Sequence, residues 1–551
     1  MSAQGAFAFV LHSHIPYVRQ AGMWPHGEEW LHEAQAETYI PLLDALNKLD
    51  GEGLPVRLTL SLTPVLLEQL ADPEVRSHFK AYLADRRTAA EEDRRRFERE
   101  GQPELAELAQ AYRERYRTVQ RSFEEAYSGD LVPAFRDLQE RGVLDIATSA
   151  ATHAYLPLLA SDASIRLQLS EGVHTHQRQL GRRPRAIWLP ECAYRPAYYL
   201  EGGGLRPGME DLLERYGLEL FFAETHLIEG GAPVGMAAGE GFGPYGAIDR
   251  DYVVPTGEVL ASHRASTLRP YWVGESRVAV IGRDNPTGMQ VWSGEHGYPG
   301  DFEYREFHKK DSHSGLQYWR VTGKDVELGM KSRYASDRAA RRVESHANHF
   351  VSLVAERLQE GHRQGVDFPL VSSHYDTELF GHWWHEGVSW LERTLRRLAS
   401  DPRIELTTPL DYLDRHPPSK SLNLPEGSWG AGGGHHVWDN EANHWMWDEI
   451  HRCETDFRRL MGTLKPDSKP LDSGLKQLAR ELLLMQASDW PFLVTTGQAP
   501  AYAEERFRQH VQRFDRLAGQ LAEGSVDAEF LAAVYEADKV FPDIQPDWFA
   551  E

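Results

Sequence analysis

The pattern of hydrophobic and polar positions along the chain alternates between short apolar runs and longer stretches with helical periodicity. The apolar runs lie at 7–11, 56–62, 144–147, 186–189, 218–223, 278–281 and 368–371, with a shorter one at 404–406. Strands that alternate with helices over this length are typical of parallel βα units. The pattern therefore predicts an α/β protein whose strands form an open or closed barrel.

Polar side chains that can take part in catalysis or binding follow nearly every apolar run. They are His12, His14, Thr63, His153, Glu191, Glu224, His226, Arg283, Asp284, His374 and Asp376. In a barrel of parallel strands, the carboxyl ends of the strands open at one mouth, and this mouth carries the active site. We therefore expect these side chains to gather at a single site.

Residues 1–415 hold the predicted barrel, and two stretches inside it differ in composition. Residues 73–129 are charged and rich in Ala, Glu and Arg, which predicts an inserted helical hairpin that breaks near 101–103 and serves as a solvated structural arm. Residues 229–262 begin with a Gly-rich stretch and are interpreted as a mobile loop region. Residues 416–551 predict a C-terminal helical domain that packs against the barrel and contributes aromatic residues to its cleft.

The chain of 551 residues carries 83 acidic and 60 basic residues, a formal net charge of −23. This excess argues against a polyanionic partner such as nucleic acid and does not disfavour a neutral substrate. The two cysteines, Cys192 and Cys453, fit neither a disulfide framework nor a paired-Cys zinc pattern. The sequence shows no secretory leader and no apolar run of about 20 residues, so we expect a cytoplasmic protein without a membrane anchor.

Two carboxylates stand out because each follows a strand-like run and has aromatic and His neighbours: Glu191 and Asp376. Glycosidases use one carboxylate at the anomeric carbon and one carboxylic acid at the leaving oxygen, about 5 Å apart in retaining enzymes. The pair therefore predicts glycoside chemistry. The alternative is that each carboxylate caps a helix or forms a salt bridge after its strand.

Four histidines accompany the two carboxylates. His12 and His14 are two positions apart, so their side chains point to the same face of a strand. With His153, His374 and Asp376 they could form a mononuclear metal site of the kind found in barrel deacetylases. Histidines also hydrogen-bond the hydroxyl groups of sugars, and each one taken singly could be a structural residue.

Tryptophans are frequent, and flat aromatic faces suit stacking on the apolar faces of sugar rings. Any one of them is more often a core residue. Trp429 and Trp438 lie in or beside a Gly-rich stretch at 427–435 that is hard to explain as core, so we favour a place in the cleft for both.

Several distinct motifs occur in order along the chain: HSHIPY at 12–17, ATHAYLP at 151–157, WLPECAY at 188–194, VWS at 291–293, GYPGD at 297–301, SHYDTELFGH at 373–382 and SDWPF at 488–492. With these motifs the sequence resembles glycoside hydrolase family 57 and, within it, the 1,4-α-glucan branching enzyme group. The resemblance implies an incomplete (β/α)7 barrel, in which 404–406 is not a full barrel strand. It implies no metal and no organic cofactor.

The resemblance also implies roles for individual residues. Glu191 would be the nucleophile and Asp376 the general acid/base of a retaining transfer. The donor and acceptor clefts would be lined by His12, His14, His153, His374, Trp292, Trp429, Trp438 and Asp489. Trp24 and Arg283 complete our candidate substrate-binding residues, together with Tyr245, the candidate for a tyrosine near the tip of the family's catalytic loop.

We therefore expect a branching enzyme that cleaves an α-1,4 bond, holds the released chain on Glu191 as a glycosyl ester and passes it to a 6-hydroxyl. An α-1,4-glucan such as amylose or glycogen would be donor and acceptor. The alternatives are an α-amylase-like hydrolase or 4-α-glucanotransferase on the same site, a metal-dependent polysaccharide deacetylase, and a non-catalytic glycogen-binding scaffold, which the presence of both carboxylates disfavours.

Overall fold

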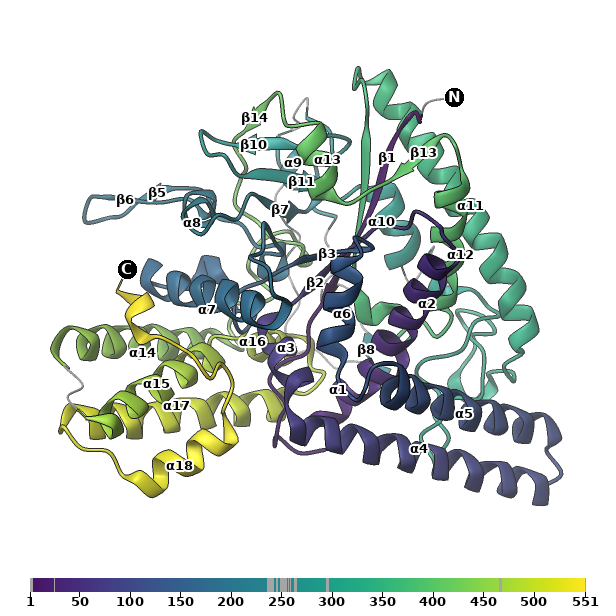
Figure 1. Ribbon diagram of the computed structural model, residues 1–551, viewed down its shortest axis with the longest axis horizontal. Coiled ribbons are helices and arrows are strands. Elements are labelled where there is room, and N and C mark those ends of the chain that lie inside the picture. The colour runs from purple at the N-terminus through teal and green to yellow at the C-terminus, as the bar shows by residue number, and fades with distance from the viewer. Residues whose placement is uncertain are drawn as a thin grey trace.

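The structure is a computed structural model that describes residues 3–23, 25–234, 242–243, 246–247, 255, 257, 259–261, 265–293, 297–464 and 468–550. Figure 1 shows the strands in the upper and central part of the molecule, surrounded by helices. The C-terminal helices, coloured green to yellow, gather at the lower left, and two long dark blue helices extend at the lower right.

Among the described residues, seven parallel strands succeed one another around the centre of the molecule. In spatial order they are β12 (Leu370–Asp376), β1 (Gly5–Ser13), β2 (Leu58–Leu62), β3 (Leu144–Ala147), β4 (Ala186–Ile187), β7 (Leu220–Ala223) and β11 (Ala279–Gly282). An isolated parallel bridge between Thr148 and Ile187 joins β3 to β4. These strands and their helices confirm the predicted α/β class.

The barrel is incomplete between β11 and β12. No ladder of the described residues connects these two strands, and their ends meet through the backbone N–H of Asp284, which donates to Ser372 O over 2.9 Å. The shorter run at 404–406 forms β13 (Ile404–Leu406), which pairs only with Gly5–Phe7 at the start of β1, whereas β2 pairs with the end of β1. This run is therefore an addition to the barrel sheet.

The central strand β1 is buried at all nine positions because both of its faces are covered. Phe7 and Phe9 point to one face, where Phe9 stacks on Phe350 at 5.6 Å between ring centroids. The small side chains Ala6 and Ala8 point to the other face. This continuous burial explains why the run shows no alternation of polar and apolar residues.

The remaining strands are short. β10 (Tyr271–Val273) pairs antiparallel with β11, and β14 (Ser421–Leu422) pairs with β10. Two small antiparallel pairs are β5 (Tyr198–Tyr199) with β6 (Leu205–Arg206), and β8 (Phe242–Gly243) with β9 (Gly246–Ala247).

Helices of the barrel unit follow the strands in chain order. They are α1 (Glu28–Ala34), α2 (Ile40–Gly51), α3 (Pro64–Ala71), α4 (Pro73–Arg99), α5 (Pro103–Arg121), α6 (Leu131–Glu140), α7 (Asp162–Leu180), α8 (Met209–Arg215), α9 (Thr225–Glu229), α10 (Asn285–Trp292), α11 (Ser336–Arg363), α12 (Gly387–Ser400) and α13 (Pro409–Arg415). A π-helical turn at Gln35–Tyr39 joins α1 to α2.

The inserted hairpin consists of α4 and α5. Asp72 caps α4 by accepting hydrogen bonds from the backbone of Glu74 and Val75, and the hairpin turns at Gly101, whose φ is +67°. The hairpin is more than a solvated arm. Tyr318 donates a 2.8 Å hydrogen bond to Asp93, because the segment after β11 folds against the hairpin and buries one of its sides.

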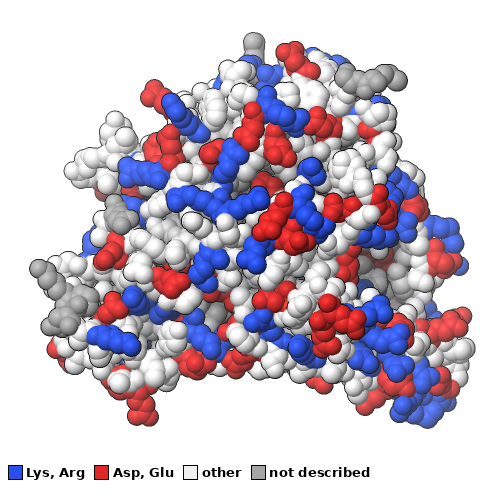
Figure 2. Space-filling model, viewed as in Figure 1, with Lys and Arg blue, Asp and Glu red and all other residues white. Residues whose placement is uncertain are grey.

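The C-terminal helices are α14 (His444–Thr463), α15 (Lys469–Met485), α16 (Asp489–Thr496), α17 (Pro500–Ala522) and α18 (Ala528–Ala537). The stretch before them is not helical, and its β14 belongs to the sheet of the barrel unit. The C-terminal helices therefore begin at His444, and the domain boundary at 416 stays a prediction. Charged side chains of both signs are interspersed on the face that Figure 2 shows.

None of the helices in the described part of the chain has both the length and the apolar character of a membrane span.

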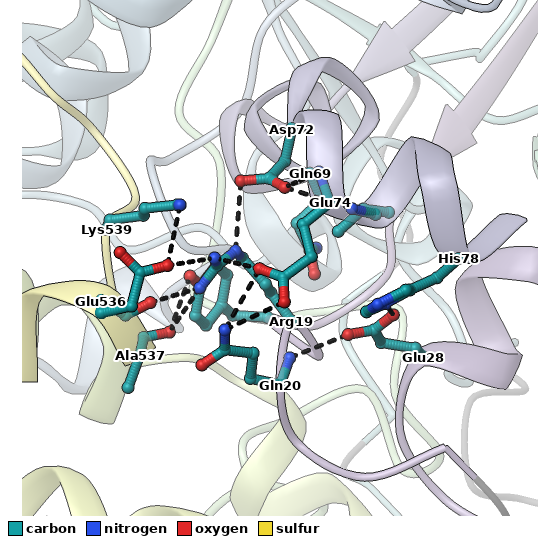
Figure 3. A network of polar contacts seen from close by, with 12 residues as sticks. Arg19, Gln20, Glu28, Gln69, Asp72, Glu74, His78, Glu536, Ala537 and Lys539 are labelled. Carbon is teal, nitrogen blue, oxygen red and sulfur yellow. Dashed lines mark hydrogen bonds and ion pairs between the residues drawn. The ribbon is translucent and has the colours of Figure 1, made fainter. Parts of the chain in front are cut away.

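A buried arginine joins the barrel to the C-terminal helices (Figure 3). Arg19, in the segment after β1, is 2% exposed. Its guanidinium contacts Asp72 at 3.1 Å, Glu536 at 2.8 Å and the carboxylate of Glu74, and it donates to the backbone carbonyl of Ala537. Arg19 thus ties α18 to the start of the inserted hairpin.

We predict that Arg19→Met lowers the free energy of unfolding by about 3 kcal/mol, because it leaves the partly buried carboxylates of Asp72 and Glu74 without the cation of Arg19. Chemical denaturation measures this loss. Arg452→Met is the matched control: Arg452 also contacts three carboxylates, Glu449, Asp456 and Asp515, but is 40% exposed, so its loss costs at most about 1 kcal/mol. Equal losses in the two variants contradict the assignment.

Candidate active site at the mouth of the barrel

Glu191 lies in a short 3-10 turn at Pro190–Cys192 that follows β4. Its φ of +60° is in the left-handed region, which a non-glycine residue adopts only when its surroundings hold it there. Trp429 donates its indole N–H to Glu191 Oε2 over 2.7 Å, and Ser488 donates to Oε1 over 3.1 Å. The backbone N–H of Trp429 also bonds the Glu191 carbonyl. Two segments outside the barrel strands therefore fix this carboxylate.

Asp376 ends β12, where it pairs in register with His12 of β1. No described residue donates a hydrogen bond to its carboxyl group. Burial, together with the negative charges of Glu378 and Glu191, raises the pKa of Asp376 well above its usual range, and the nearby Arg283 opposes this only in part. These surroundings favour the protonated form of Asp376.

The surroundings of Glu191 differ from those of Asp376. Burial and the charge of Asp489 raise the pKa of Glu191 to about 7, while the hydrogen bonds from Trp429 and Ser488 and the charge of His14 favour its ionised form. A carboxylate with two donors and a carboxylic acid with none, in one site, can divide the roles of nucleophile and acid.

A chain of neutral side chains leads to Glu191. Ser488 donates to the carboxylate, which can only accept, so Ser488 accepts from His153 Nδ1 at 2.9 Å. His153 Nε2 then accepts from His12 Nε2 at 3.0 Å, and His12 Nδ1 accepts from Ser61 at 3.1 Å. Burial lowers the pKa of both histidines well below the usual range, in agreement with neutral rings. Every hydrogen bond in this chain points toward Glu191.

His14 has a different environment from His12, although they share a strand face. Its Nε2 contacts Asp489 at 3.0 Å, and its Nδ1 bonds Thr63 at 3.1 Å. Burial opposes protonation, but the Asp489 carboxylate prevails and raises the pKa of His14. The ring stacks on His153 at 4.0 Å between centroids. The expected residues His12, His14, His153 and Asp489 are therefore brought together.

Arg283 and His374 lie behind the acid side of the site. Arg283 forms a buried ion pair with Glu224, the residue that caps the start of α9. His374 Nε2 bonds Ser372 Oγ at 2.8 Å, and burial together with the charge of Arg283 lowers the pKa of His374 well below its usual range. Both side chains are almost fully buried, so they form part of the wall of the site.

Three neighbouring tryptophans, Trp429, Trp292 and Trp383, extend from the indole group that binds Glu191. Trp292 donates to the His374 carbonyl over 3.3 Å and lies 6.2 Å from the ring of Trp429 and 6.5 Å from that of Trp383. Trp292 and Trp383 are partly exposed. These rings give the site an aromatic wall.

Trp438 departs from the expected place in the cleft. It has no exposed surface and stacks on Tyr155 at 4.5 Å between ring centroids. The glycines at 430–434 explain this position, because they let the loop fold back over the ring: a Cβ added at Gly430 would lie 2.6 Å from it. Trp438 is a packing residue in this structure.

Trp24, Tyr245 and most of the segment 229–262 lie outside the described residues. The separation of the Glu191 and Asp376 carboxyl groups stays a prediction.

Three possible metal donors, His14, His153 and Asp489, have atoms within 4.8 Å of one another in the described part of the chain. They are not the set expected for a deacetylase, which included His374 and Asp376. Their donor atoms bind each other or Ser488, so the cluster is satisfied by hydrogen bonds, and we assign no metal to it.

Sequence reasoning missed three residues of this site: Ser488, Trp188 and Glu378. Ser488 opens the SDWPF motif, and Glu378 follows Asp376 by two positions, so both lay inside recognised motifs. Trp188 opens the WLPECAY motif, and the His12 ring stacks on it at 4.8 Å between ring centroids; because Trp188 is fully buried, it reads in the sequence like any other core aromatic residue.

Residues 8–425 match glycosyl hydrolase family 57, and residues 449–549 match the C-terminal region of 1,4-alpha-glucan branching enzymes. The chain belongs to glycosyl hydrolase family 57. The resemblance deduced from its motifs is thereby confirmed.

Known relatives refine this assignment. A 1,4-alpha-glucan branching enzyme of Thermococcus kodakarensis is 43% identical over 98% of this chain and 77% of its own length. Its crystal structure, in complex with glucose, has a TM-score of 0.88 at 41% identity and covers 99% of this chain and 96% of that one. The branching enzyme of Pyrococcus horikoshii also gives 0.88 at 41%, covering 99% and 97%. Within family 57, this chain is a 1,4-α-glucan branching enzyme.

The structure is also similar to a hydrolase. The α-amylase AmyC of Thermotoga maritima has a TM-score of 0.81 at 30% identity and covers 99% of both chains.

We predict that Trp429→Phe moves the acidic limb of the enzyme's pH profile to higher pH. The variant keeps a ring but loses the N–H that stabilises ionised Glu191, so the pKa of Glu191 rises above about 7 and a larger fraction is protonated and inactive below it. We expect kcat/KM to fall about 10-fold to 100-fold at pH values below that pKa and less above it.

The matched control is Trp292→Phe, which removes an indole N–H that donates to a backbone carbonyl instead of to Glu191. Its acidic limb should stay in place whatever happens to its rate. A limb that fails to move in Trp429→Phe contradicts the proposed hydrogen-bond effect.

Proposed function

We propose that the branching reaction of this family 57 enzyme proceeds by double displacement on Glu191 and Asp376. Glu191 attacks the anomeric carbon of an α-1,4-glucan and forms a glycosyl ester, while Asp376 gives its proton to the departing 4-oxygen. Asp376, now ionised, removes the proton of an acceptor 6-hydroxyl. That oxygen attacks the anomeric carbon, the ester bond breaks, and an α-1,6 branch is formed with Glu191 released as a carboxylate.

The contrast between the two carboxyl groups carries this proposal. Glu191 accepts hydrogen bonds from Trp429 and Ser488, which suits a nucleophile that must be ionised. Asp376 has no donor among the described residues and faces negative charge, which suits an acid that must hold a proton.

The other side chains divide into a substrate wall and a support. The partly exposed Trp292 and Trp383 offer their faces to glucose rings of the donor and acceptor α-glucan. The buried His12 and His153 support Ser488, whose hydroxyl they keep oriented toward Glu191. The His14–Asp489 pair, 11% and 14% exposed, can hydrogen-bond sugar hydroxyl groups at the floor of the site.

We place the enzyme in the cytoplasm, where α-glucan is its partner. Cys192 and Cys453 are free and buried, as is usual in a reducing compartment.

Glu191→Ala and Asp376→Ala test the two roles. Each should lower kcat by about 10³-fold or more while far-UV circular dichroism stays unchanged. Azide should rescue both variants on α-maltosyl fluoride, because fluoride leaves without being protonated. In Glu191→Ala, azide attacks the sugar directly, and one inversion gives the β-azide. In Asp376→Ala, azide attacks the glycosyl ester, and two inversions give the α-azide. The opposite anomers would exchange the roles, and near-native rates would remove the residue from the mechanism.

Hydrolysis is the second candidate activity, because AmyC shares the fold. Incubation with amylose, followed by debranching, chain-length analysis and a count of reducing ends, separates the two. Branching yields new α-1,6 links with few new reducing ends. Reducing ends that accumulate without new branches would mark a hydrolase.

A further inference from the structure

A π-helical turn places a buried tyrosine next to the acid side of the site. The turn Gln35–Tyr39 interrupts an otherwise continuous helix, and such turns are frequent at functional sites. The loop after β12 comes very close to it: a Cβ at Gly381 would lie 2.0 Å from Glu37 O, and the φ of Gly381 is +105°. Only glycine fits there. This close approach brings Tyr39 to the segment that carries Asp376.

Tyr39 contacts a carboxyl group that the double displacement does not use. Its hydroxyl donates to Glu378 Oε1, and the backbone N–H of His14 donates to the same oxygen over 3.3 Å. Glu378 is 5% exposed and Tyr39 1% exposed. Glu378 follows Asp376 by two positions, on the 3-10 turn Thr377–Leu379. A second, buried carboxyl group is thus fixed beside the acid.

We propose that Glu378 and Tyr39 are positioning residues for the acid/base Asp376: Tyr39 holds Glu378 as an ionised neighbour, and the charge of Glu378 keeps the proton on Asp376 until the leaving oxygen takes it. The inference rests on the proposed role of Asp376. It assigns the proton-holding function to a residue pair that touches neither the substrate bond nor Glu191.

The charges around Asp376 support this order of effects. After burial, the charge of Glu378 is the largest cause that raises the pKa of Asp376; that of Glu191 comes second, and the cation of Arg283 opposes both. On the side of β1, His12 is neutral because burial lowers its pKa. Glu378 is therefore the neighbour whose removal should change Asp376 most.

Tyr39 keeps Glu378 charged. Burial raises the pKa of Glu378 to about 7, and the hydrogen bond from Tyr39 and the charge of His14 hold it from rising further. Burial and the charges of Glu378 and Asp376 raise the pKa of Tyr39 well above its usual range, so Tyr39 keeps its proton and stays a donor. Removing the hydroxyl group should neutralise Glu378 over part of the working pH range.

The test is the basic limb of kcat/KM, measured from about pH 5 to about pH 10 on amylose, where activity falls as Asp376 loses its proton. Glu378→Gln removes the neighbouring charge, so the pKa of Asp376 falls and the limb should move to lower pH by about one unit. Tyr39→Phe should move the limb in the same direction by a smaller amount. A purely structural role would lower kcat and leave the limb where it is.

Glu37→Gln is the matched control. Glu37 is a buried carboxylate of the same π-helical turn, and it accepts a 2.9 Å hydrogen bond from His382 of the same loop, but its charge is not among those that act on Asp376. The basic limb of kcat/KM of this variant should not move, even if the variant is less stable. An equal shift in the control would overturn the inference.

The outcomes separate this inference from the proposed function. If Asp376→Ala stays active, the role of Asp376 fails and the inference fails with it. If Asp376→Ala is inactive and shows the expected azide product, but neither Glu378→Gln nor Tyr39→Phe moves the basic limb, only the inference is overturned. If Glu378→Gln does not fold, the milder Tyr39→Phe still decides.

Discussion

Parallel strands that end at one mouth force their terminal side chains into a small space, and this convergence governs the rest of the structure. Glu191, Asp376 and Glu378 are carboxyl groups of that mouth, and each has a pKa raised by burial. Buried carboxylates are stable only when donors or cations compensate them. The barrel strands alone do not supply enough donors, so the chain brings Trp429 and Ser488 to Glu191 from beyond residue 416.

The compensation is unequal, and the chemistry follows from that inequality. Glu191 receives two hydrogen bonds and a neighbouring His14 whose pKa is raised, whereas Asp376 receives no hydrogen bond from the described residues and faces two acidic neighbours. The surroundings of these two residues of similar intrinsic acidity therefore favour different protonation states. The chain of neutral side chains from Ser61 to Ser488 orients the Ser488 hydroxyl toward Glu191. It adds no charge to a site that already holds several carboxyl groups.

Much of this arrangement was visible in the sequence, for physical reasons. The strands were recognisable because both faces of a barrel strand are buried, and the polar residues after each run marked the mouth. The hairpin of α4 and α5 was recognisable from its Gly-free and Pro-free interior. The hydrogen-bond partners of Glu191 were not recognisable. Ser488 lies 297 positions from Glu191, and no local sequence pattern indicates a contact over such a separation. The place of Trp438 in the cleft was predicted wrongly, because a Gly-rich loop can either line a cleft or fold over an aromatic ring, and the sequence does not distinguish the two.

The position of Ser488 and Asp489 has a consequence for the evolution and engineering of the enzyme. Because the helical domain supplies a donor to Glu191 and the anion that pairs with His14, the two parts of the chain form one catalytic unit that is completed only by docking. A barrel separated from its helices would keep its carboxylates and lose their charge balance. The helices therefore cannot be exchanged as an accessory module, and each change at the docking surface is also a change in the acidity of Glu191.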